Sequence, residues 1–222
     1  MPGMAFDIGQ LPRRTFLRGV AGVSAAAAGL VLPGMASAAD EPRIYRCAEW
    51  GARPPAEPLT TLDHPADRVL IHHIACPNST DYSLAHAFQV ARDDQADHMD
   101  NNGWSDTGQH FTVTRGGYRL EGRHGSLDAL RSGTKIVRAA HCPGQNDNAI
   151  GIENEGTYTE VEPPEAQWES LVVFVAHVCR QYGIPAEEIN GHRDYYNTDC
   201  PGDKLYARLP ELRSRVAQEL TG

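Results

Sequence analysis

Residues 68–75 read RVLIHHIA, and this stretch decides the fold of the chain. Its β-branched and other apolar residues predict a short buried strand, which the turn residues at 76–78 bring to an end. Successive side chains of a strand point to opposite faces, so His72 and His73 are expected on opposite sides of a sheet. The strand therefore carries two potential ligands to its carboxyl end.

Other segments predict the partners of this strand. Residues 109–114 and 118–121 flank Gly116-Gly117, which is the arrangement expected of a β-hairpin. Residues 149–155, AIGIENE, predict another strand, and the short segment 188–191 predicts the end of one more.

Three segments have helical periodicity. The first is expected to begin at Asp81 or Ser83 and to end at Gly103, and the second covers Pro164 to Tyr182 with Gly183 as its stop. A last helix is expected from about Lys204, and Pro210 either interrupts or restarts it. Because strands and helices interleave without strict alternation, we expect an α/β fold with a central mixed β-sheet flanked by helices on both faces.

The N-terminus differs in kind from the rest of the chain. Arg13-Arg14 precede an uncharged Ala- and Gly-rich stretch that ends at Leu32, and Ala36-Ser37-Ala38 follows. This pattern predicts a twin-arginine signal peptide at residues 1–38, with export to an extracellular, cell-wall or periplasmic location. A membrane span is the alternative, but the stretch is shorter than the roughly twenty residues needed to cross a bilayer.

Residues 39–222 are then expected to form one domain, because the 222-residue chain shows neither a linker tract nor a repeat. The formal net charge is −9. Removing residues 1–38 takes away three arginines and one aspartate, a net +2, and leaves −11. A surface of this charge disfavours nucleic acid as a partner and attachment to a membrane by charge. Separately, we expect a monomer.

Five cysteines form an odd set for an exported protein, where thiols normally pair. If Cys200 binds a metal, four remain for two disulfides in one of three connectivities; these are Cys47, Cys76, Cys142 and Cys179. Free buried thiols are the alternative.

Potential metal ligands concentrate in three segments, at residues 71–74, 191–194 and 198–202. A catalytic zinc takes three protein ligands and keeps a fourth position open, and imidazole with thiolate is a favoured mixture. His192 and Cys200 are separated by a turn that lets both reach one ion. A single His or Cys is more often structural, so the prediction rests on the combination.

Several stretches, taken in order, resemble one family. The chain is similar to the peptidoglycan recognition protein and type 2 N-acetylmuramoyl-L-alanine amidase family, which includes phage T7 lysozyme and the AmpD-type amidases. The matching stretches are residues 49–54 (EWGARP), 71–73 (IHH), 103–111 (GWSDTGQHF), 121–123 (EGR), 140–141 (AH), 148–153 (NAIGIE) and 191–194 (GHRD) through 200–202 (CPG).

This resemblance implies Zn²⁺ held by His72, His192 and Cys200 at one end of the sheet. Members that only bind peptidoglycan typically lack the Cys, so its presence implies an enzyme. The implied reaction is zinc-dependent hydrolysis of the amide between N-acetylmuramic acid and L-alanine in peptidoglycan or muropeptides. A non-catalytic peptidoglycan-binding module and a zinc amidase acting on another acyl-peptide are the alternatives.

The resemblance also assigns roles around the metal. Glu153 matches the carboxylate of AmpD-like members and is expected to act as the base, with Glu155 on the same face as the other candidate. Glu153 could instead orient His192 or pair with an arginine. Thr198 stands where some members carry Lys, and its hydroxyl is expected to assist the developing oxyanion.

Three further residues are expected to contact substrate. Gln109 stands where the phage enzyme carries a catalytic Tyr, and because Gln has no titratable proton, hydrogen bonding to substrate is the expected role. His141 and Asn146 match family positions near the substrate, and a structural role is the alternative for His141.

Overall fold

The computed structural model describes residues 41–221, which belong to one compact unit. The predicted signal peptide at residues 1–38 lies outside the described part of the chain. Among the helices that are described, none combines the length and the apolar character needed to cross a membrane.

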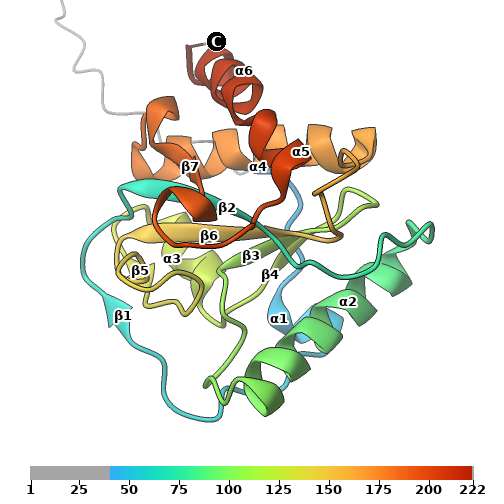
Figure 1. Ribbon diagram of the computed structural model, residues 1–222. Helices are drawn as coiled ribbons and strands as arrows, with labels where there is room; N and C mark the ends of the chain where they lie inside the picture. The colour runs from blue at the N-terminus through green and yellow to red at the C-terminus, as the bar shows by residue number, and fades with distance from the viewer. Residues whose placement is uncertain (1–40, 222) are drawn as a thin grey trace, which may run out of the picture. The chain divides into compact units, whose positions relative to one another are not determined.

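A five-stranded mixed sheet forms the centre of this unit (Figure 1). Three neighbouring pairs of strands are parallel and one pair, the predicted hairpin, is antiparallel. In sheet order the strands are β4 (Arg119–Glu121), β3 (Phe111–Val113), β6 (Ala149–Asn154), β2 (Arg68–His73) and β7 (Ile189–Gly191). A separate pair is formed by β1 (Thr61–Leu62) and β5 (Ile136–Val137). The predicted mixed sheet is thereby confirmed.

Side chains alternate along β2 and β6, so the sheet has a core face, which packs on the main apolar core, and an opposite face that carries His72 and is called the site face below. Val69 and Ile71 of β2 are fully buried in the main apolar core, together with Ile150 and Ile152 of β6. The alternate residues of these strands, such as Leu70 and His72, point to the opposite face because side chains alternate along a strand. Burial of both faces explains why these strands read as nearly continuous apolar runs.

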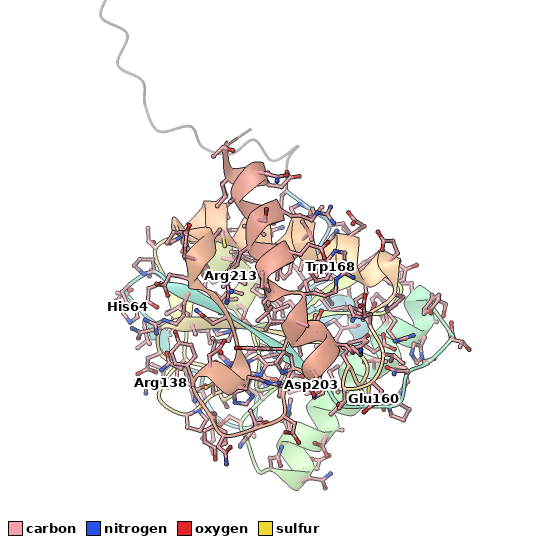
Figure 2. The ribbon with its side chains drawn as sticks, turned by 45° about the horizontal axis from the view of Figure 1, so that its top comes forward. His64, Arg138, Glu160, Trp168, Asp203 and Arg213 are labelled. Carbon is pink, nitrogen blue, oxygen red and sulfur yellow. The ribbon has the colours of Figure 1, made fainter. Side chains whose placement is uncertain are left out.

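Helices cover both faces of the sheet, as expected (Figure 1). On the core face lie α4 (Glu165–Tyr182) and α6 (Leu209–Thr221), which pack against each other. Trp168 of α4 is buried beneath the guanidinium of Arg208, and Arg213 of α6 donates its Nε–H to the Ile189 carbonyl of β7 at 2.7 Å (Figure 2).

On the site face lies α2 (Leu84–Ala96). Ser83 caps it by accepting a hydrogen bond from the His86 amide at 3.2 Å. The helix continues as a π-helical turn, η1 (Asp97–Asn101), and the chain leaves it at Gly103, whose φ is 69°. Both predicted ends of this helix are therefore close to the observed ones.

The remaining elements are short: α1 (Cys47–Trp50), α3 (Ser126–Ser132), η2 (Ala186–Glu188), η3 (His192–Asp194) and α5 (Asp203–Ala207). The helix expected from Lys204 is divided into α5 and α6. Pro210 is the second residue of α6, where its missing N–H leaves no helical hydrogen bond unmade, so it restarts the helix.

All five cysteines are free, so the structure contains neither of the two expected disulfides and agrees with the alternative of free thiols. Cys179 is buried in the core on α4, whereas Cys47 in α1 directs its thiol toward the carbonyls of Glu121 and Gly122. Cys76 lies in the loop after β2, and Cys142 packs beneath Leu70. Cys179, Cys47 and Cys142 therefore belong to three different apolar clusters.

Candidate metal centre and active site

Two histidines meet because their strands are parallel neighbours. Ile71 of β2 is in register with Gly191 of β7, so the next residues, His72 and His192, emerge side by side at the same sheet edge. Their ring centroids are 4.4 Å apart. The pairing depends on register, and a shift by one residue would turn His72 into the core.

Cys200 joins them from the loop that follows η3. Its thiol lies 3.7 Å from Nδ1 of His72, and its backbone N–H donates to the Thr198 hydroxyl at 3.2 Å. Arg193 fixes the loop, since its backbone N–H donates to the Cys200 carbonyl at 3.2 Å. One donor atom from each of His72, His192 and Cys200 lies within 4.8 Å of the others, which brings the predicted triad together.

The chemistry of this triad fits a metal ion that takes nitrogen and sulfur ligands. Burial lowers the pKa of His192, and burial together with the neighbouring histidines lowers that of His72 well below its usual range, so both imidazoles are neutral. Burial raises the pKa of the Cys200 thiol to about 12. A bound cation would reverse that effect and favour the thiolate. Nε2 of His192 is buried without a hydrogen-bond partner.

His141 forms a hydrogen bond with His72 and thereby fixes its tautomer. Its Nε2 lies 3.1 Å from the Ala149 carbonyl, which can only accept, so Nε2 carries the proton. The bare Nδ1 of His141 then accepts from Nε2 of His72 at 3.0 Å. This leaves Nδ1 of His72 free on the side that faces Cys200. Both ring nitrogens of His141 are thus engaged within the protein, in agreement with the structural alternative.

Asn146 shapes the loop that carries His141. Its Oδ1 accepts hydrogen bonds from the backbone N–H groups of His141 and Cys142, each at 2.9 Å. Asn146 and His141 also line a groove of about 360 Å³, together with Trp104 and Tyr196. Asn146 therefore borders a cavity next to the triad while it holds the His141 loop in place.

Gln109 does not reach the cavity, so the expected contact with substrate is not met. The residue is fully buried, and its amide donates to Oδ2 of Asp94 at 2.6 Å and to the Thr112 hydroxyl at 2.9 Å. The reason is its position two residues before β3, where its side chain reaches both Asp94 of α2 and Thr112 of β3.

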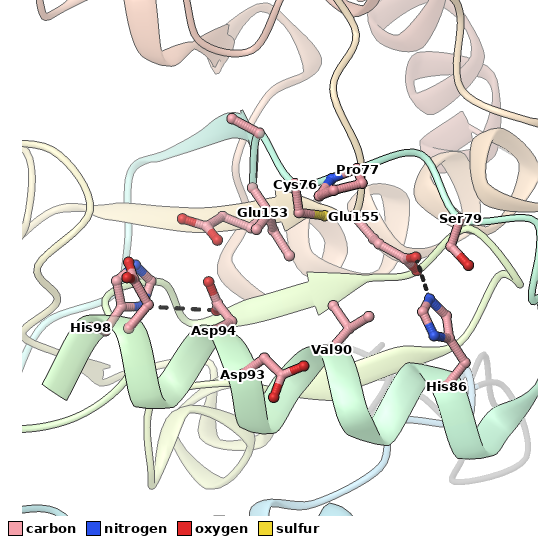
Figure 3. A pocket seen from close by; sticks show the side chains of 13 residues that line it. Cys76, Pro77, Ser79, His86, Val90, Asp93, Asp94, His98, Glu153 and Glu155 are labelled. Atoms are coloured by element: carbon pink, nitrogen blue, oxygen red, sulfur yellow. Dashed lines mark hydrogen bonds and ion pairs between the residues drawn. The ribbon is translucent and has the colours of Figure 1, made fainter. Parts of the chain in front are cut away.

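Glu153 lies beside the metal triad. It is in register with His72 in the adjacent parallel strand, so both side chains occupy the site face of the sheet. It lines the cavity of the triad and also a second cavity of about 490 Å³ between α2 and residues 74–79 (Figure 3). Burial, followed by the nearby charge of Asp94, raises its pKa well above the ordinary value. Its Oε2 is buried without a partner.

Glu155, the other candidate base, is engaged elsewhere. Its Oε1 lies 2.9 Å from Nε2 of His86, and its Oε2 accepts from the Arg115 backbone N–H at 2.8 Å (Figure 3). Glu153, in contrast, makes no ion pair with an arginine anywhere in residues 41–221. The geometry favours Glu153 as the carboxylate of this site.

Sequence reasoning missed two residues of the site, Asp94 and His98. They are four residues apart on the inner face of α2 and η1, and both are buried. One side-chain atom of each lies within 4.8 Å of the Glu153 carboxylate and of the other. An i, i+4 pair of polar residues on the apolar side of a predicted helix was the available signal.

Comparison with known proteins finds amidases and peptidoglycan recognition proteins as relatives. Residues 62–203 match the family described as N-acetylmuramoyl-L-alanine amidase. Peptidoglycan-recognition protein LB of Drosophila melanogaster is 31% identical over 168 residues, covering 75% of this chain and 67% of that protein. N-acetylmuramoyl-L-alanine amidase of Sus scrofa is 33% identical over 172 residues, covering 76% of this chain, which spans only 27% of that amidase.

Solved structures give the same picture. Drosophila PGRP-LB superposes with a TM-score of 0.65 at 30% identity, covering 75% of this chain and 92% of that one. A complex of tracheal cytotoxin with the ectodomains of peptidoglycan recognition proteins LCa and LCx gives a TM-score of 0.66 at 30% identity, with coverage of 76% and 95%. The mixed sheet with its flanking helices is the fold of these proteins.

Proposed function

Since this chain belongs to the N-acetylmuramoyl-L-alanine amidase family, we propose that it is a zinc-dependent enzyme that hydrolyses the amide between N-acetylmuramic acid and L-alanine. The observation that carries the proposal is the convergence of His72, His192 and Cys200 next to Glu153, whose Oε2 is buried without a hydrogen-bond partner. A module that only binds peptidoglycan has no need of a thiol and a buried carboxylate at this point.

His72, His192 and Cys200 would hold the Zn²⁺. When bound, the ion supplies a Lewis acid that polarises the scissile carbonyl and lowers the pKa of water. The three side chains come from β2, from the residue after β7 and from the following loop. Binding the ion would therefore also tie these segments together.

Glu153 is assigned the proton transfer. Its carboxylate lines the cavity of the triad, where it can accept the proton of the attacking water. It then delivers this proton to the L-alanine nitrogen as the amide bond breaks, so that the peptide leaves as a neutral amine and the Glu153 carboxylate is regenerated. Glu155 cannot take over this role while it is held by His86 and Arg115.

Thr198 is assigned to the oxyanion. Its hydroxyl accepts from the Cys200 backbone N–H through a lone pair, so its own proton remains available for donation. The residue lines the same cavity as the triad and Glu153. A neutral hydroxyl is a modest donor, and its contribution is correspondingly smaller than that of the metal.

Peptidoglycan fragments are the ligand class that the relatives support. The LCa–LCx complex contains tracheal cytotoxin bound to peptidoglycan recognition proteins. For this chain we propose a muropeptide or the polymer itself, encountered outside the cytoplasm after export through the twin-arginine signal at residues 1–38.

The test is release of free stem peptide from purified sacculi and from a soluble muropeptide, with zinc content measured on the same sample. We expect cleavage by the zinc-loaded protein and a loss of at least about 10²-fold in kcat for Glu153→Gln with the zinc retained. Glu155→Gln serves as the matched control for removing a nearby carboxylate. Tight binding of muropeptide without turnover would instead identify a recognition module.

A substrate panel separates the remaining alternative. Equal cleavage of a muropeptide and of acyl-peptides that lack the muramyl group would indicate a zinc amidase of broader or different specificity. Preference for the muramyl substrate is the expected result.

A further inference from the structure

A chain of polar contacts leads from the interior of the fold to Glu153. The Gln109 amide donates to Oδ2 of Asp94, and a carboxylate oxygen of Asp94 lies within 4.8 Å of one of Glu153. Figure 3 shows Asp94 on α2 pointing toward Glu153 on β6. The two side chains therefore face each other across the space between α2 and β6, where both line the same cavity.

We propose that Asp94 is a positioning residue for Glu153, and that Gln109 fixes Asp94 so that the Glu153 carboxylate faces the metal triad. This inference rests on the proposed function, because it assigns a support to the residue that moves the proton. It also gives Gln109 a function at a position where relatives of the phage enzyme carry a catalytic Tyr.

Burial argues that this arrangement is not incidental. Asp94 is 8% exposed and Gln109 is fully buried, so each must form hydrogen bonds to offset the loss of water. Asp94 finds its donor in Gln109. Asp93, the neighbouring carboxylate on the same helix, is instead exposed and accepts from Gln89 at 2.6 Å.

Anchoring from other directions leaves Asp94 little freedom. The ring of His98 stacks on Trp104 with centroids 4.7 Å apart, and its Nδ1 accepts from the Gly108 backbone N–H at 3.2 Å. This Nδ1 also lies 3.7 Å from Oδ2 of Asp94. Asp94 is therefore enclosed by fixed groups, and Glu153 is its partner on the side of the cavity.

A double-mutant cycle on the zinc-loaded protein tests the proposal, using Asp94→Ala, Glu153→Gln and the double variant on one muropeptide. We expect Asp94→Ala to lower kcat by about 10- to 100-fold with little change in KM. If Asp94 acts through Glu153, the double variant has the rate of Glu153→Gln alone. Effects that multiply would overturn the proposal.

Two further variants separate positioning from general damage. Asp94→Asn keeps an acceptor for Gln109 and a donor for Glu153, so it should restore most of the kcat lost in Asp94→Ala. Asp93→Ala removes the exposed carboxylate next to it and should leave kcat and KM unchanged. Equal loss in Asp94→Asn and Asp94→Ala would contradict the assigned role.

A crystal structure of the Asp94→Ala protein decides the matter without an activity measurement. We expect the Glu153 side chain to leave its position while His72, His192 and Cys200 keep theirs. A Glu153 carboxylate in the same place as in the parent protein would refute the inference. Failure of the parent protein to cleave any muropeptide, in contrast, would refute the proposed function and leave this structural outcome decisive.

Discussion

Nδ1 of His141 lies 3.0 Å from Nε2 of His72, and through this contact the Ala149 carbonyl sets the tautomer of His72, a candidate metal ligand. The carbonyl fixes the proton of His141 on Nε2, and His141 in turn fixes the proton of His72 on its own Nε2. Nδ1 of His72 is left without a proton on the side of Cys200, where it can serve as a metal ligand. Partners of this kind set both the tautomer and the ring orientation of a ligating His.

Replacing His141 should therefore weaken metal binding although His141 is not a ligand. For His141→Ala we expect metal affinity to fall by about 10- to 100-fold, measured by competition with a chromogenic chelator. His177→Ala is the matched control, because His177 is also buried but lies on α4. An unchanged affinity in His141→Ala would show that His72 is oriented without it.

Gly151→Ala should disturb the same contact without removing a polar group. A Cβ at Gly151 would lie 2.5 Å from Cδ2 of His141, which is closer than real carbon atoms approach. The ring must then shift, which disturbs its hydrogen bond with His72, and metal affinity should fall as it does in His141→Ala. Combining the two substitutions should cost little more than His141→Ala alone. Full additivity would contradict this explanation.

Cys200→Ala should abolish stable zinc binding, because it removes the anionic ligand from a set of three. Zinc should raise the unfolding temperature of the parent protein relative to the chelator-treated form, since the ligands come from separate segments. In Cys200→Ala that difference should disappear. Cys179→Ala, which alters a buried thiol of the core, should keep both the zinc and the temperature difference.

Thiol titration checks the cysteine pairing. The structure has five free cysteines, so denatured, chelator-treated protein purified without reductant should react with five equivalents of a thiol reagent. One equivalent would instead indicate the two disulfides expected for an exported chain. In native zinc-loaded protein Cys200 should be protected, and chelation should expose it.

Stability should depend on pH through Asp106 and His124, whose Oδ2 and Nδ1 are 2.8 Å apart. The hydrogen bond from Asp106 raises the pKa of His124 above its ordinary 6.5. Burial alone would raise the pKa of Asp106, but hydrogen bonds from His124 and other donors lower it below its ordinary 3.8. The pair is therefore fully stabilising between about pH 4 and pH 6.

Its contribution should fade as the pH rises through the raised pKa of His124, and also as the pH falls through the lowered pKa of Asp106. The measurement is urea unfolding of the parent protein and of His124→Gln at pH 5, 7 and 9. Because His124 is partly exposed, we expect a difference of no more than about 1 kcal/mol at pH 5, shrinking by pH 9. A difference that grows with pH would contradict the assignment.

The sequence by itself predicted the main strands and helices and the three candidate metal ligands. Local periodicity and turn residues predicted β2, β6, the β3–β4 hairpin and α4 close to their observed bounds, since alternation and helical spacing are properties of neighbouring residues. His72 and His192 could be assigned because motifs carry them at strand ends, and Cys200 because a motif carries it in the loop that follows. That these three residues, far apart in the sequence, belong to one site was implied by the family resemblance and not by local periodicity.

Only the tertiary structure decided what surrounds the triad. The register of β2 with β6 sets Glu153 beside His72, and the packing of α2 across the sheet brings Asp94 to Glu153 and draws Gln109 inward. The fold also places Cys179, Cys47 and Cys142 in three different apolar clusters, and all five cysteines are free. These relationships join residues tens of positions apart, and local periodicity carries no information about which distant surfaces meet, because that is settled by the burial of whole faces.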